Sequence, residues 1–182
     1  MQKTILLAVT GSIAAYKSAD LTNGLKRLGY NVKVIMTRGG EKFITPLTLQ
    51  NLSGNYVYTD LWDENDPSAV QHIELMTTAD LFLVAPASAN VIGKMANGIA
   101  DDLVSTLAMV ACENIPRLIA PAMNTNMYEN KMMKLNLDKL KAYGYEEIEP
   151  RISMLACGVV GKGAMASIEK IIEKVQEVCP ID

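Results

Sequence analysis

The sequence LFLVAPASAN, residues 81–90, decides the fold and locates the candidate site. Its first half, Leu81–Ala85, is a continuous apolar run, which is typical of a strand buried on both faces of a parallel sheet. Pro86 has no N–H for strand pairing, so we expect the strand to end there. The small and polar residues 87–90 then follow the carboxyl end of a central strand, where ligands bind in open α/β sheets.

A second stretch repeats this arrangement further along the chain. Leu118–Ala120 is apolar and runs into PAMN, residues 121–124. The carboxyl ends of parallel strands meet at one edge of a sheet, so we expect the two turns to face the same crevice. The side-chain amide of Asn124 can bind a carboxylate or an amide without adding charge. An Asx turn or a helix cap explains Asn124 equally well from propensity alone.

Strand and helix patterns alternate along the whole chain, and no linker or low-complexity tract interrupts them. We expect strands at 5–9, 32–36, 56–58, 81–85, 118–120 and 145–148, and helices at 14–28, 41–52, 70–77, 91–95, 102–112, 126–143 and 168–178. Residues 151–163 are rich in glycine, and we expect them to be irregular. The alternation predicts one α/β domain over residues 1–182, with three layers and a doubly wound, Rossmann-like parallel sheet of about six strands.

The composition argues against several kinds of partner. The chain carries 17 Lys and Arg against 20 Asp and Glu, a net charge of −3, so we expect no nucleic acid and no membrane partner. Its three cysteines, Cys112, Cys157 and Cys179, are far apart, which favours free thiols in a reducing cytoplasm. Cys112 and Cys179 fall in helical patterns and are expected to pack. One histidine and scattered cysteines give no metal-ligand spacing, so we expect no metal.

Other positions carry possible chemistry. Gly11 and Ser12 follow the first strand, where open amides at the start of a helix favour a phosphate, although a plain tight turn is about as common. His72 is the only histidine and can exchange a proton near neutral pH, whereas a surface or capping role is the simpler explanation. Cys157 lies among glycines in MLACGVVGKG, residues 154–163, which suggests a flap that can fold over a ligand.

Five motifs together resemble the homo-oligomeric flavin-containing cysteine decarboxylases, over essentially the whole chain. They are TGSIA at 10–14, PASAN at 86–90, GKMANGIADD at 93–102, PAMNTNM at 121–127 and ACGVVGKG at 156–163. The resemblance implies the flavoprotein fold and FMN as the cofactor. The residues it places around FMN are Gly11, Ser12, Ile13, Thr37, Ser88, Ala89, Asn90, Val91 and Ala122, with Ser105 and Thr106 as weaker candidates.

Two positions depart from the pattern of that family. Val91 stands where the family's PASANT has a threonine, so it cannot offer a hydroxyl to the flavin. Ala164 stands where the flap of the family has an arginine, which changes how the substrate is covered.

The resemblance also implies the reaction, which is decarboxylation of 4′-phosphopantothenoylcysteine to 4′-phosphopantetheine in coenzyme A synthesis. His72 would assist oxidation of the thiol-bearing carbon by FMN. The thioaldehyde so formed would stabilise the carbanion left when carbon dioxide departs. Asn124 would hold the substrate carboxylate, with Met127 beside it, and Cys157 would protonate the enethiol while reduced FMN returns the hydride.

The implied partners are the small-molecule substrate and further copies of the chain, as a trimer or a dodecamer of trimers with the flavin pocket between subunits. Because the chain stops at Asp182, a separate phosphopantothenate–cysteine ligase is expected upstream in the same cytoplasmic pathway. Several alternatives remain open. They are peptidyl-cysteine decarboxylation in lantibiotic maturation, flavin prenyl transfer, a non-catalytic flavin-binding regulatory protein and a generic nucleotide-binding module.

Overall fold

The computed structural model describes residues 2–62, 71–111, 114–154 and 160–181. A six-stranded parallel sheet in the order β3-β2-β1-β4-β5-β6 forms its centre. The strands are β1 Thr4–Val9, β2 Asn31–Met36, β3 Val57–Tyr58, β4 Leu81–Ala87, β5 Arg117–Pro121 and β6 Tyr145–Glu147. The order reverses direction between β1 and β4, which confirms the predicted doubly wound sheet.

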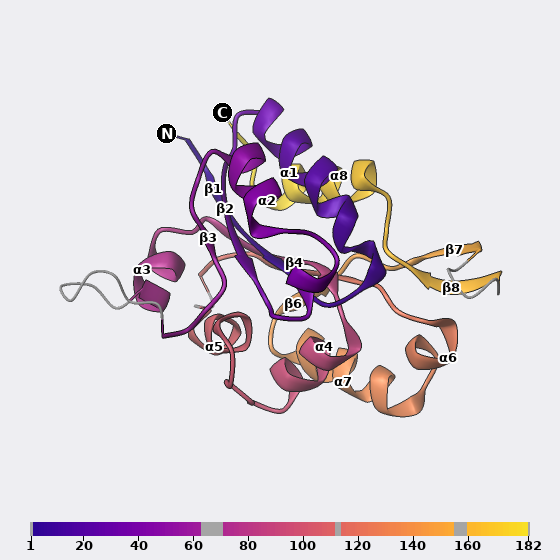
Figure 1. Ribbon diagram of the computed structural model, residues 1–182. Coiled ribbons are helices and arrows are strands. Elements are labelled where there is room, and N and C mark those ends of the chain that lie inside the picture. The colour runs from indigo at the N-terminus through magenta and orange to yellow at the C-terminus, as the bar shows by residue number, and fades with distance from the viewer. Residues whose placement is uncertain (1, 63–70, 112–113, 155–159, 182) are drawn as a thin grey trace.

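Helices cover both faces of the sheet (Figure 1). One layer holds α1 Ser18–Arg27, α2 Pro46–Ser53 and α8 Ile168–Val178. The other layer holds α3 Gln71–Thr77, α4 Ala89–Ala96, α5 Leu103–Val110 and α7 Lys131–Ala142. Within the described ranges, no helix combines the length and the apolar character that crossing a membrane requires.

The central strands are buried on both sides, as their unbroken apolar runs predict. In β1, Ile5 and Leu7 pack into the cluster under α1 and α8, whereas Leu6 and Ala8 pack into the cluster under α4 and α5. Every residue of β4 is buried. Full burial of each such Leu or Ile contributes roughly 1.5–3 kcal/mol of hydrophobic stabilisation, so the sheet holds its strand ends in fixed positions.

The prediction that Pro86 ends its strand is wrong. β4 continues through Pro86 to Ala87, with a cis peptide bond between Ala85 and Pro86. The pairing with β5 shifts register after Val84 and resumes between Ala87 and Pro121. Pro86 lies in this irregular stretch and has no N–H to donate to the neighbouring strand. Pairing with β5 is therefore interrupted at Pro86 and resumes at Ala87.

Two predicted helices are each split in two. Residues 41–52 form a 3-10 turn, η2 Gly40–Lys42, and then α2, which begins at Pro46 because Thr45 caps it through Thr48 N. Residues 126–143 form α6 Thr125–Tyr128 and α7, with Asn130 as the cap of α7. In both cases a capping side chain in mid-segment starts a new helix, which apolar periodicity does not reveal.

The start of the first predicted helix also differs from the prediction. Residues Ile13–Lys17 form a 3-10 helix, η1, and α1 follows directly. Leu28, the last residue of the predicted helix, is 41% exposed at the C-terminus of α1. Gly29 follows the helix with a φ of 98°, a backbone conformation that favours glycine. Cys179 packs in the core as predicted, whereas Cys112 lies outside the described residues.

The glycine-rich segment 151–163 was predicted to be irregular, and this is wrong for its described parts. β7 Arg151–Met154 pairs antiparallel with β8 Val160–Ala164. This hairpin projects from the body of the molecule, at the opposite side from α3 (Figure 1). Gly161 and Gly163 of this hairpin pack closely against Met123 and Thr125, where a side chain would have no room. These glycines therefore allow the strand to approach the rest of the protein and do not end it.

Candidate active site

A cavity of about 590 Å³ opens at the carboxyl ends of β1, β4 and β5. Its wall on one side is formed by the turn after β1 together with η1. The turn after β4 and the connection between β5 and α6 form a second wall, and the β7–β8 hairpin forms a third. The two strand–Pro–small–Asn turns therefore face one crevice, as their spacing predicts, and Ala122 N donates to Ala87 O at 3.1 Å between them.

Thr10 fixes the turn after β1 to the turn after β4. Its buried hydroxyl donates to Pro86 O at 2.6 Å and accepts a hydrogen bond from Ser88 N at 2.8 Å. Both backbone groups lie at the irregular end of β4, where the sheet ladder leaves them without a regular partner. The threonine hydroxyl satisfies them and holds the two turns in register at the wall of the cavity.

A pair of glycines packs beneath the turn after β1. A Cβ on Gly11 would lie 3.1 Å from Gly39 Cα, and a Cβ on Gly40 would lie 2.6 Å from Val9 O. Thr37 closes this loop, because its hydroxyl accepts a hydrogen bond from Gly40 N at 3.1 Å. The close backbone approach leaves the cavity edge at Gly11 free of side chains, which a phosphate-sized group needs.

Asn124 caps α6, which confirms one of the two explanations of this residue, and it also lines the cavity, where its binding role stays a prediction. Its Oδ1 accepts a hydrogen bond from Asn126 N at 2.8 Å. The neighbouring Met123 N donates to Gly163 O at 3.0 Å, which attaches the hairpin to the β5–α6 connection. A Cβ on Gly163 would fall against Met123 O, so only glycine allows the hairpin to sit here.

The structure brings most of the predicted site residues to this cavity. Those that line it are Gly11, Ser12, Ile13, Ser88, Ala89, Asn90, Ala122, Asn124 and Met127. Thr37 lies behind the lining in the glycine loop described above.

Two other predicted positions do not line the cavity. The Val91 side chain is buried in the core under α4, and Thr106 contacts Ala100 O at 3.5 Å on α5. The other weaker candidate, Ser105, is buried in the capping box with Asp102.

The structure does not describe the side chains of His72 and Cys157, the two predicted proton-transfer residues. The backbone of His72 lies in α3, whereas its side chain is not described, and no described residue of α3 lines the cavity. Cys157 lies outside the described residues, between β7 and β8. Their roles remain predictions.

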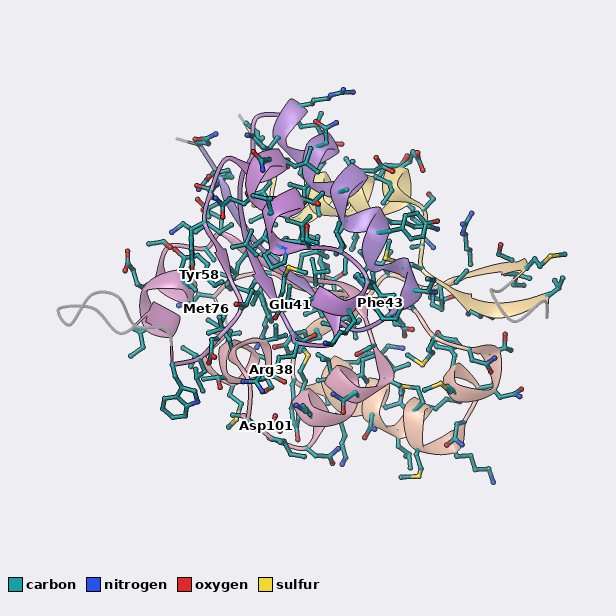
Figure 2. All side chains as sticks on the ribbon, viewed as in Figure 1. Arg38, Glu41, Phe43, Tyr58, Met76 and Asp101 are labelled. Carbon is teal, nitrogen blue, oxygen red and sulfur yellow. The ribbon has the colours of Figure 1, made fainter. Side chains whose placement is uncertain are left out.

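Sequence reasoning missed several larger side chains of the cavity, among them Lys17 on η1, Phe43 after η2 and Arg151 on β7. Figure 2 labels Phe43. Burial lowers the pKa of Lys17, and repulsion from Arg151 lowers it further. None of the described lining residues is acidic. The cavity is therefore locally cationic in a chain of net charge −3. A lysine shortly after the first turn was visible in the sequence, but nothing there indicated which way it faces.

The motif at residues 93–102 has a structural role in this chain. Lys94 Nζ contacts Asp101 at 2.6 Å and Asp102 at 2.7 Å, and Asp102 caps α5 by accepting from Ser105 N. Burial opposes the charge on Lys94, but its hydrogen bonds to the two carboxylates dominate and raise its pKa. These contacts fix the turn between α4 and α5.

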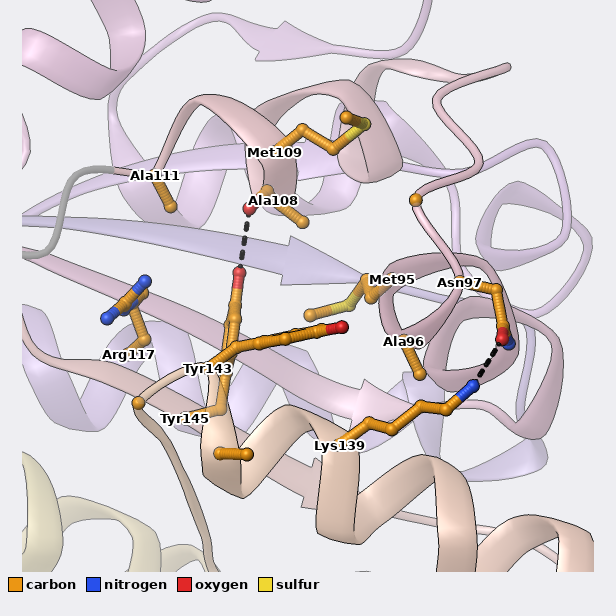
Figure 3. Close-up of a pocket in the computed structure, with 13 residues that line it drawn as sticks. Met95, Ala96, Asn97, Ala108, Met109, Ala111, Arg117, Lys139, Tyr143 and Tyr145 are labelled. Atoms are coloured by element: carbon orange, nitrogen blue, oxygen red, sulfur yellow. Dashed lines mark hydrogen bonds between the residues drawn. The ribbon is translucent and has the colours of Figure 1, made fainter.

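A second and larger cavity, of about 900 Å³, lies at the opposite edge of the sheet (Figure 3). It is bordered by the ends of α4, α5 and α7 and by the amino ends of β5 and β6. Lys139 Nζ donates to Asn97 Oδ1 at 2.7 Å, and Tyr145 donates to Ala108 O at 3.0 Å. Arg117 lies over the Tyr145 ring, with its guanidinium carbon 5.2 Å from the ring centre.

A family model described as Flavoprotein matches residues 1–179. The chain belongs to the flavoprotein family. It is 52% identical over 177 residues to a probable phosphopantothenoylcysteine decarboxylase of Streptococcus mutans, a match that covers 97% of this chain and 99% of that protein. It is 49% identical over 171 residues to a bifunctional coenzyme A biosynthesis protein of Bacillus subtilis; the match covers 94% of this chain but only 42% of that relative.

Solved structures of other flavoproteins superpose closely on this chain. One is a variant of a PPC decarboxylase in complex with pantothenoylaminoethenethiol. Its TM-score is 0.88 at 32% identity, and the match covers 97% of this chain and 98% of that chain. Another is the FMN-binding protein AtHal3, with a TM-score of 0.84 at 32% identity, covering 97% and 96% of the two chains. The predicted flavoprotein fold is therefore confirmed.

Proposed function

We propose that this chain is an FMN-dependent decarboxylase that converts 4′-phosphopantothenoylcysteine to 4′-phosphopantetheine in coenzyme A biosynthesis. The observation that carries the proposal is the single cavity into which the PASAN turn, the PAMN turn and the glycine hairpin converge. The names of the flavoprotein relatives support the same substrate. We assign the whole activity to the one domain that the family model covers.

The residues that line the cavity fit FMN. Helix α4 begins at Ala89, and its first hydrogen bond to a main-chain carbonyl runs from Ile92 N to Ser88 O at 3.0 Å. The N–H groups of Ala89 and Asn90 therefore precede the intrahelical ladder at the cavity wall, where a helix N-terminus favours negative charge. Together with the turn at Gly11 and Ser12 they would hold the cofactor. FMN supplies an acceptor for a hydride from the thiol-bearing carbon and returns it later.

Asn124 and the hairpin would orient the substrate. Because α6 requires its cap, the Asn124 side chain is held at the cavity wall, where its amide can donate to the substrate carboxylate. The hairpin residues Ser153 and Met154 line the opposite wall and would exclude water from the reacting carbon. Holding the carboxylate next to the oxidised carbon is the condition for loss of carbon dioxide.

We propose that His72 takes the thiol proton and that Cys157 returns a proton to the enethiol. Helix α3, which carries His72, lies at the far side of the molecule from the hairpin (Figure 1). A single copy of the chain would then not unite the base with Asn124. A second copy of the chain, with its α3 beside this cavity, would bring its His72 close to Asn124.

The surface around the cavity supports assembly. Ile13, Tyr16, Phe43 and Met127 line it and are 46–58% exposed. Met154 on the hairpin is 71% exposed. Exposed apolar side chains gathered at one mouth mark an interaction surface, and we propose that a trimer covers them. We also propose that a separate ligase supplies the substrate and that both proteins act in the cytoplasm.

The test is to purify the protein, reconstitute it with FMN, and measure carbon dioxide release from the phosphorylated substrate and from a cysteine-terminated peptide. We expect yellow protein, a trimer in sedimentation, and release from the small substrate alone. Protein that stays colourless after reconstitution contradicts the flavin assignment. Release from the peptide alone contradicts the substrate assignment.

A further inference from the structure

Two cations line the active-site cavity without an anionic partner among the residues that the structure describes. Lys17 ends η1 and Arg151 begins β7. Among the described residues, neither side chain forms an ion pair within 4 Å or a hydrogen bond. Other half-buried lysines behave differently, since Lys94 and Lys174 each contact two carboxylates. Lys17 is partly buried and Arg151 is exposed, and together they place positive charge on the cavity wall with which an anionic ligand can pair.

The burial of Lys17 and the nearby charge of Arg151 also favour an anion in this part of the cavity. Its side chain is partly buried, and its Nζ lies 5.9 Å from the centre of the Tyr16 ring. Burial lowers its pKa, and the charge of Arg151, which lines the same cavity, lowers it further. A doubly charged anion between them would relieve both costs. Hydrogen bonds at the start of α8 lower the pKa of Glu169, and the charge of Arg151 lowers it further, but Glu169 does not line the cavity.

The position of the pair separates it from the expected cofactor phosphate. Lys17 lies five residues after Ser12 along a 3-10 helix, a rise of about 10 Å at roughly 2 Å per residue. Arg151 lies at the base of the hairpin, which would cover the substrate rather than the flavin phosphate.

We propose that Lys17 and Arg151 form a subsite for the phosphate monoester at the far end of the substrate. The inference rests on the proposed function and goes beyond it, because it explains how a phosphorylated small molecule is preferred over a cysteine-terminated peptide. Arg151 offers a planar fork of donors that suits phosphate oxygens, and Lys17 adds a point charge. Neither residue takes part in the chemical steps, so the pair sets affinity and selectivity.

The test compares Lys17→Gln, Arg151→Gln and the double variant with the natural protein. Each is assayed with 4′-phosphopantothenoylcysteine and with pantothenoylcysteine, which lacks the phosphate. We expect KM for the phosphorylated substrate to rise about 10-fold in each single variant and about 100-fold in the double variant, because each loses a charge-assisted contact. We expect KM for the dephosphorylated substrate to change less than about 2-fold and kcat to stay similar for both.

Lys42→Gln is the matched control, because Lys42 is exposed on η2 and does not line the cavity. It removes the same charge and should leave both KM values unchanged. Equal losses with the two substrates would overturn the inference, because the pair would then bind the shared carboxylate. Weakened binding of FMN to the variants would also overturn it, because the pair would then serve the cofactor phosphate.

A binding experiment separates this inference from the proposed function. Calorimetry with 4′-phosphopantetheine and with pantetheine needs no turnover. If the natural protein releases no carbon dioxide but binds the phosphorylated ligand at least about 10-fold more tightly, and the double variant loses that preference, the subsite stands without the reaction. If the natural protein binds the two ligands equally, the subsite is refuted whatever the activity.

Discussion

The two cavities of this protein differ in a way that volume does not reveal. The cavity at the carboxyl edge of the sheet, about 590 Å³, is the smaller one, and its two cations have no described anionic partner. In the 900 Å³ cavity at the amino edge, Lys139 and Tyr145 donate to neighbouring oxygens, but the buried Nε of Arg117 has no hydrogen-bond partner among the described residues. Unpaired cationic groups therefore do not by themselves distinguish the two cavities. Only the smaller cavity lies at the carboxyl ends of the strands, where ligands bind in open α/β sheets.

The largest expected difference comes from the same substitution in each cavity. Asn124→Asp keeps the cap of α6, because a carboxylate also accepts from Asn126 N. It also places negative charge against the substrate carboxylate. We expect kcat/KM to fall by about 100-fold or more, because a charged hydrogen bond is replaced by repulsion, while the melting temperature changes little.

Asn97→Asp is the control in the other cavity. Asn97 Oδ1 already accepts from Lys139, so a carboxylate strengthens that contact. We expect kcat/KM within about 2-fold of the natural value, because no substrate group lies there. Steady-state kinetics gives kcat/KM for Asn124→Asp and Asn97→Asp and shows which cavity serves the reaction. Equal losses in the two variants would mean that the amino-edge cavity also serves the reaction.

Thr10→Val tests the connection that borders the active-site cavity. The change leaves Pro86 O and Ser88 N buried without a partner. We expect the free energy of unfolding to fall by about 2–4 kcal/mol, measured by chemical denaturation, and FMN to bind more weakly. Thr10→Ser retains the hydroxyl and should cost only about 1 kcal/mol for the lost methyl group. A similar loss in both variants would show that the methyl group, not the hydroxyl, matters.

A glycine pair gives the next comparison. Gly163→Ala pushes a Cβ against Met123 O and strains the hydrogen bond from Met123 N that holds the hairpin. We expect about 1–3 kcal/mol of destabilisation and a matching loss of activity. Gly93→Ala in α4 meets only Asn136 Nδ2 at 3.9 Å and should stabilise by up to about 1 kcal/mol. Full activity of Gly163→Ala would contradict the claim that the close contact between Gly163 and Met123 positions the hairpin for the reaction.

The smallest effect is expected at the amino-edge cavity. Burial raises the pKa of Tyr145 to about 12, although the charge of Arg117 opposes the shift. An unfolded tyrosine titrates near pH 10, so the stability that neutral Tyr145 contributes is present below about pH 10 and is lost as pH rises to about 12. Tyr145→Phe removes a hydrogen bond worth about 1 kcal/mol. The difference in free energy of unfolding between the natural protein and Tyr145→Phe should decrease between about pH 10 and about pH 12. A difference that stays constant over this range would contradict the raised pKa of Tyr145.

Much of the fold could be predicted from the sequence because burial leaves a periodic record. The apolar runs at β1, β4 and β5 identified the central strands. The convergence of the two Asn-bearing turns followed from parallel topology alone.

The remaining features depend on contacts between distant residues. The hairpin forms because Gly161 and Gly163 fit against the β5–α6 connection, and no local pattern announces that fit. Thr10 looked like an ordinary turn residue, because Pro86 and Ser88 are more than 70 positions away. Lys17 and Arg151 are far apart in the sequence and line one cavity only in the folded chain. Periodicity records which side of an element is buried, but it does not record what lies there.

The most direct test is a crystal structure of the protein grown with FMN. The account predicts the flavin in the carboxyl-edge cavity, with its phosphate against Gly11, Ser12 and the first amides of α4, and with its ring beside Ala122. A flavin bound instead between Arg117 and Tyr145 at the amino edge would contradict it.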